Sequence, residues 1–66
     1  MSGEDTQIMD RAEALLKEAR TAPGSGQMAD RLWAMRRELL AAGLQLTQDG
    51  YQLVEQLHEQ WMTHRY

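Results

Sequence analysis

The chain has 66 residues, the length of one small domain, and such a domain buries only about 60 % of the surface that its unfolded chain exposes. It contains no cysteine, so neither disulfides nor thiolate zinc sites supplement its small core. Its formal net charge of -3 disfavours nucleic acids and anionic lipid as partners, because both are bound chiefly by clustered Lys and Arg.

The first predicted helix covers about residues 5–20. Its apolar residues recur at steps of three and four and so share one stripe: Ile8, Ala12, Leu15, Leu16 and Ala19. Acidic residues gather at its start and basic residues at its end, the order that suits the helix dipole. Residues 21–26, TAPGSG, predict a flexible linker, because Pro23 disfavours helical geometry at Ala22 and two glycines add backbone freedom.

The second predicted helix covers about residues 27–42 and has a wide apolar side. One stripe holds Met28, Leu32, Met35 and Leu39, and an adjoining stripe holds Ala29, Trp33 and Leu40. Because this apolar arc is wider than one contact needs, it indicates two neighbouring elements. Gly43 is expected to end the helix as a C-terminal cap.

The third predicted helix covers about residues 47–64 and starts at Thr47, a favourable N-terminal cap. Its expected apolar face carries Tyr51, Val54, Leu57, His58 and Trp61. Gly50 costs the first turn about 1 kcal/mol relative to alanine. The alternation of residues 44–47 is typical of a strand, but four residues without a second strand make no sheet.

These elements predict an all-α fold in which residues 1–66 form a single small three-helix domain. The helices at 27–42 and 47–64 are expected to form an antiparallel hairpin. The helix at 5–20 is expected to dock on this hairpin through the flexible linker.

The segment LLAAGLQLT also fits the turn of a DNA-binding helix-turn-helix regulator, which is the alternative function. The exposed side of the following helix disfavours that function, because its glutamates would repel phosphates. The residues on this side are Gln48, Gln52, Glu55, Gln56, Glu59 and Gln60. Arg31, Arg36 and Arg37 precede the turn, but such runs are commonly solvated and paired with carboxylates, here Glu38 or a neighbouring helix. We therefore interpret the segment as a joint between two helices.

No pattern indicates an enzyme, a cofactor or a metal site. Glu55 and His58 have the Glu-x-x-His spacing of metal-binding bundles, but the surrounding inward-facing residues are apolar. His58 is expected to pack beside Trp61, and His64 to serve as a cap at the end of a helix. The hydroxyl residues lie at caps, linkers or ends without a histidine and an acid arranged around them, so a non-enzymatic protein is expected.

The aromatic residues and the five methionines have two compatible interpretations. Met fills irregular gaps in cores, and Met, Trp and Arg are also enriched where proteins bind one another. The candidate partner-binding residues are Trp33, Arg36, Arg37, Leu40, Tyr51 and Trp61. The expected function is a small protein–protein interaction module, such as a regulator, an inhibitor, an antitoxin-like factor or a small chaperone or adaptor.

The expected partner is a protein that the sequence does not identify, and a second copy of the chain is one such partner. A marginal core and a wide apolar arc favour a homodimer. No stretch approaches the ~18 apolar residues of a membrane span. The segment MSGEDTQ carries acids where a secretory signal carries Lys or Arg, so a cytoplasmic protein is expected.

Overall fold

The computed structural model describes residues 3–65, which form three α-helices and one short 3-10 helix and contain no strand. Helix α1 spans Gly3–Thr21, α2 spans Gly26–Ala41 and α3 spans Gln48–His64. The 3-10 helix η1, Leu44–Leu46, lies in the joint between α2 and α3. The predicted all-α class and the three helices are confirmed. None of these helices is long and apolar enough to cross a membrane.

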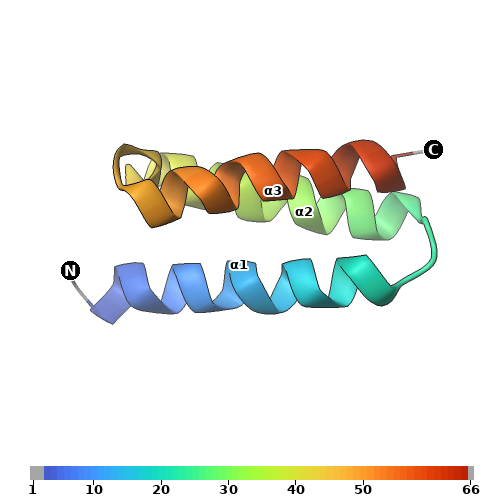
Figure 1. Cartoon of the computed structure of the whole chain (residues 1–66), viewed down its shortest axis with the longest axis horizontal. Helices are drawn as coiled ribbons and strands as arrows, with labels where there is room; N and C mark the ends of the chain where they lie inside the picture. Colours follow the sequence, from blue (N-terminus) through green and yellow to red (C-terminus); the bar gives the residue numbers. More distant parts are fainter. Residues whose placement is uncertain (1–2, 66) are drawn as a thin grey trace.

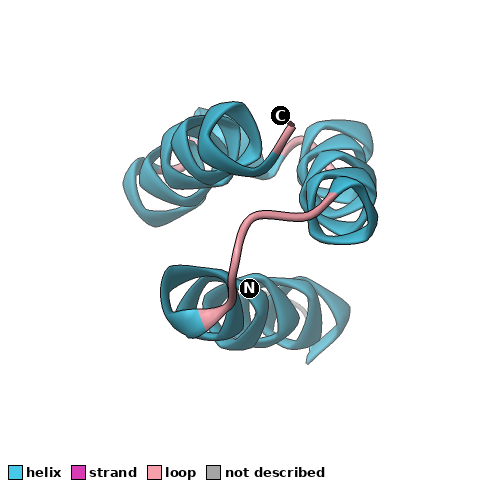
Figure 2. Cartoon of the chain, turned by 90° about the vertical axis from the view of Figure 1, so that its right-hand side faces the viewer, coloured by secondary structure: helices cyan, strands magenta, loops and turns pink. Residues whose placement is uncertain are grey.

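The three helices lie along the long axis of the molecule, and each runs in the opposite direction to the one before it (Figure 1). Helices α2 and α3 pack closely and antiparallel, which confirms the predicted hairpin, and α1 packs along both of them. Viewed end-on, the helices occupy the corners of a triangle (Figure 2). Their inward sides therefore meet in a single core.

The core draws apolar side chains from every element of the described chain. Its buried members are Ala12, Leu15, Leu16, Ala19, Met28, Ala29, Leu32, Met35, Leu39, Leu44, Leu53, Val54 and Leu57. The main stripe predicted on the second helix, which includes Leu32 and Leu39, is fully inside it. Because α1 and α3 both cover α2, the two neighbours that its wide apolar arc indicated lie within the chain itself.

The buried side of α3 differs from the predicted one. Tyr51 and His58 are exposed, whereas Leu53, which the prediction omitted, is buried. The cause is the position of α1, which packs beside the flank of α3 that carries Leu53 and places Leu16 next to it. The centre of the buried stripe is thereby turned away from Tyr51 and toward α1.

The linker between α1 and α2 covers residues 22–25, one residue less at each end than predicted. Thr21 remains helical, and its hydroxyl donates to a backbone carbonyl one turn earlier at 3.1 Å. Ser25 caps α2 by accepting a hydrogen bond from the backbone N–H of Met28 at 3.1 Å, so the helix already begins at Gly26.

The joint between α2 and α3 depends on two glycines and a threonine. Gly43 adopts a left-handed conformation with φ of 73°, which suits its predicted place at the end of α2. The Thr47 hydroxyl accepts the N–H of Gly50 at 3.0 Å and donates to the Leu44 carbonyl at 2.8 Å. Gly50 packs so closely on the joint that a Cβ atom there would overlap the Leu44 carbonyl.

His64 caps a helix, but the helix is α1 rather than its own. Its side chain is 2 % exposed, and its Nε2 atom donates to the Ala19 carbonyl at 2.8 Å. In a continuing helix that carbonyl would accept the N–H of residue 23, but Pro23 has none. His64 therefore satisfies a carbonyl that the proline leaves without its helical donor.

We expect the amides of Gly24 and Ser25 to exchange rapidly with solvent, whereas those of residues 32–39 are strongly protected. The reason is that residues 23–25 belong to no helix, while residues 32–39 lie in the middle of α2. Residue-resolved hydrogen exchange measures both groups in one sample. Ala22 serves as a protected reference beside them, because its N–H donates to a helix carbonyl at 3.0 Å. Equal protection of the amides at Gly24 and in α2 would contradict a flexible linker.

Candidate interaction surface

Two tryptophans meet across the α2–α3 hairpin. The ring centroids of Trp33 on α2 and Trp61 on α3 lie 4.8 Å apart, with a tilt of 39° between the rings. The Arg36 guanidinium lies 5.0 Å from the Trp33 ring centre, and the Arg65 guanidinium lies 5.0 Å from that of Trp61. The His58 ring lies 5.6 Å from that of Trp61. We call these five residues the tryptophan cluster.

Helical spacing explains how the cluster assembles. Arg36 follows Trp33 by three residues, and Arg65 follows Trp61 by four, so each arginine lies one turn from its ring on the same helix face. Trp33 and Trp61 then face each other because the two helices run antiparallel (Figure 1). The result is a row in which two mutually tilted rings are flanked by two cations.

The cluster lies at the surface and is supported by the core. Trp33 is 37 % exposed, and Trp61 is partly buried and packs against the core. Neither ring is among the buried core residues, and Trp61 packs against their edge. An aromatic pair that is partly accessible at the surface offers a partner an apolar contact with little conformational entropy to lose.

Three of the six predicted partner-binding residues come together in the cluster, namely Trp33, Arg36 and Trp61. His58 and Arg65 of the cluster were not among the predicted residues. The expectation that His58 packs beside Trp61 is confirmed. Arg65 was missed, although its spacing of four residues from Trp61 would have placed it on the same face.

The other three predicted residues lie outside the ring contacts. Leu40 is partly buried and packs against the core, and Arg37 is exposed one turn after Trp33. Tyr51 is 53 % exposed, and its hydroxyl bonds to Glu55. This hydrogen bond and the carboxylate charge raise the pKa of Tyr51 above its ordinary value.

Ion pairs mark the opposite side of α2, where it meets α1. Arg31 pairs with Glu18 at 2.9 Å, and Arg11 pairs with Glu38 at 2.9 Å. The hydrogen bond from Arg31, helped by its charge, lowers the pKa of Glu18. The sequence predicted that the arginines of α2 pair with Glu38 or with a neighbouring helix, and Arg31 pairs with a neighbouring helix. Glu38 pairs with Arg11 of α1 and not with an arginine of α2.

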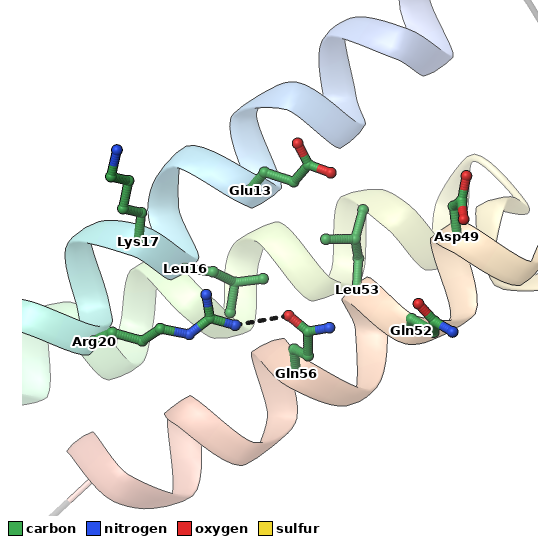
Figure 3. A pocket seen from close by; sticks show the side chains of 8 residues that line it. All are labelled: Glu13, Leu16, Lys17, Arg20, Asp49, Gln52, Leu53 and Gln56. Carbon is green, nitrogen blue, oxygen red and sulfur yellow. Dashed lines mark hydrogen bonds between the residues drawn. The ribbon is translucent and has the colours of Figure 1, made fainter.

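A separate polar groove of about 530 Å³ lies between α1 and α3 (Figure 3). Its lining residues are Glu13, Leu16, Lys17, Arg20, Asp49, Gln52, Leu53 and Gln56. An Arg20 Nη2 atom donates to Gln56 Oε1 at 2.8 Å and bridges the two helices. The Lys17 ammonium points away from the other labelled side chains in Figure 3. Charges of both signs line this groove without converging on one point, so its chemistry specifies no ligand.

Residues 3–65 contain no group of three or more histidine, aspartate or glutamate side chains arranged to hold a metal ion. The two residues with metal-ligand spacing have other contacts, since Glu55 bonds to Tyr51 and His58 packs on Trp61. The chain matches no protein-family model, and no curated protein or solved structure matches it. Among the surfaces described, the tryptophan cluster is the candidate binding site.

Proposed function

We propose that this protein is a non-enzymatic interaction module that binds another polypeptide through the tryptophan cluster. The observation that carries the proposal is the Trp33–Trp61 pair at the surface, with Trp33 exposed and a guanidinium 5.0 Å from the centre of each ring. Trp and Arg are the residue types that most often dominate the binding energy of protein interfaces. A regulator, an inhibitor, an antitoxin-like factor or a small adaptor acts through such a surface.

Two further observations bear on the choice of function. A helix-turn-helix crosses its two helices at about 90–120°, whereas α2 and α3 lie antiparallel (Figure 1), so no observation favours the DNA-binding alternative. Most of the apolar arc that suggested a homodimer is covered by α1 and α3, and Trp33 is the member that remains 37 % exposed. The cluster is therefore one of the surfaces that a second copy could use.

The test is affinity capture with three forms of the immobilised chain: the wild type, Trp33→Ala and Leu46→Ala. Leu46 is a matched control because it is 86 % exposed and lies in η1, apart from the contacts of the cluster. We expect the wild type and Leu46→Ala to retain the same protein, and Trp33→Ala to lose about 30-fold or more in affinity for it, as for an interface hot spot.

Circular dichroism melts of all three forms accompany the capture and show that each is folded. If a folded Trp33→Ala variant retains the same protein as strongly as the wild type, the cluster is not the binding surface. If Leu46→Ala loses it instead, the surface lies at the α2–α3 joint. Either result contradicts the proposed function.

A further inference from the structure

Among the residues that the structure describes, no carboxylate pairs with Arg36. Its guanidinium is partly buried over Trp33, and its Nε atom is enclosed without a hydrogen-bond partner. The acids of its own helix are Asp30 and Glu38, and neither pairs with Arg36, since Glu38 pairs with Arg11 of α1. A guanidinium that has no carboxylate partner within the described residues is able to bind one from another molecule.

The other side of α2 provides the contrast. Arg31 and Arg11 both have a carboxylate partner at 2.9 Å across the α1–α2 boundary. Within the described residues, these two ion pairs lie at the α1–α2 boundary, whereas Arg36, on the tryptophan cluster, has no carboxylate partner. The whole chain carries a net charge of -3, so the cationic character belongs to this face and not to the protein in general.

This charge distribution discriminates between partners. A symmetric dimer through the cluster would place the Arg36 guanidiniums of both protomers in one interface, and like charges at an interface are unfavourable. A partner with carboxylates beside apolar side chains meets no such repulsion. Its apolar side chains would cover the rings, and a carboxylate would reach the guanidinium of Arg36.

We propose that the partner of the tryptophan cluster is an acidic amphipathic segment of another protein, with a carboxylate that pairs with Arg36. A helical segment fits best, because its side chains spaced by three and four residues present one apolar stripe bordered by acids. This proposal rests on the proposed function, since it names the chemistry of the partner that the same cluster binds.

The test uses the full chain and three synthetic helical peptides of about four turns. Each peptide has a leucine stripe, and the residues beside the stripe are all glutamate, all glutamine or all lysine. The two tryptophans of the chain both belong to the cluster, so their fluorescence reports on this face alone. We expect the glutamate peptide to bind about tenfold or more tightly than the glutamine peptide, and the lysine peptide to bind least.

The matched variants are Arg36→Gln and Arg31→Gln, which remove the same charge from opposite sides of α2. We expect Arg36→Gln to abolish most of the preference for glutamate, and Arg31→Gln to retain it, because Arg31 already pairs with Glu18. Thermal melts show whether both variants are folded. Equal affinity for the glutamate and glutamine peptides, or equal losses in both variants, would overturn the proposal.

Three further outcomes also overturn it and identify a different occupant or none. Binding of none of the peptides excludes an acidic helix as the ligand. Sedimentation equilibrium that shows a dimer abolished by Trp33→Ala assigns the face to a second copy. A short DNA duplex that binds as tightly as the glutamate peptide shows that the face responds to negative charge alone. The loss of captured protein in Trp33→Ala tests the proposed function separately, so the two can fail independently.

Discussion

Replacing Gly50 by alanine is expected to destabilise the protein by about 3 kcal/mol, although alanine is the better helix former by about 1 kcal/mol. Gly50 lies in the first turn of α3, where a Cβ atom would overlap the carbonyl of Leu44. Because that atom belongs to the backbone, no side-chain rotation relieves the overlap, and the whole α2–α3 joint has to shift. Chemical denaturation followed by circular dichroism measures the loss.

Gly26→Ala is the matched control for this substitution. Gly26 is also in the first turn of a helix, but a Cβ atom there meets nothing within 4 Å. We expect this variant to equal the wild type in stability or to exceed it by up to about 1 kcal/mol. Should Gly50→Ala behave like Gly26→Ala, the close approach between α3 and Leu44 does not exist in solution.

Leu39→Ala and Trp33→Ala are expected to separate folding from binding. Leu39 is 0 % exposed in the core, so its truncation should cost about 2–5 kcal/mol of folding stability. Trp33 is 37 % exposed, and its loss should cost the fold less, about 1–2 kcal/mol, mainly through the lost contact with Trp61. Its larger effect should fall on affinity for the captured partner.

Denaturant melts of both variants, read beside their binding titrations, measure the two effects. Under conditions where both are folded, Leu39→Ala should bind nearly as the wild type does, because the side chain is not at the surface. If Trp33→Ala unfolds the chain while Leu39→Ala loses only affinity, the core and the interface have been assigned the wrong way round.

Local patterns predicted the helices well. The spacing of Leu32, Met35 and Leu39 identifies the inner side of α2, and Thr47 marks the start of α3, because both signals are contained within a few neighbouring residues. The position of one helix relative to another has no such local signal. For that reason the prediction placed Tyr51 on the buried side and omitted Leu53, whose burial depends on where α1 packs.

In the candidate site, too, local features were predicted and contacts between helices were not. The residue types Trp33, Arg36 and Trp61 were sufficient to suggest a binding surface, but their direct stacking depends on the register between α2 and α3. The sequence also did not predict that Arg36 lacks a carboxylate partner. Glu38 lies only two residues away in sequence, but it pairs with Arg11 of α1. Sequence spacing within one helix does not reveal pairing between helices.

The bond between His64 and the Ala19 carbonyl has a consequence for sequence variation. The carbonyl needs this donor because Pro23 supplies none, so the requirements at positions 23 and 64 are linked although 41 positions separate them. In homologous chains we expect proline at 23 to occur together with a side-chain donor at 64. Where another residue replaces the proline, its own N–H is able to continue the helix, and position 64 is free to become apolar.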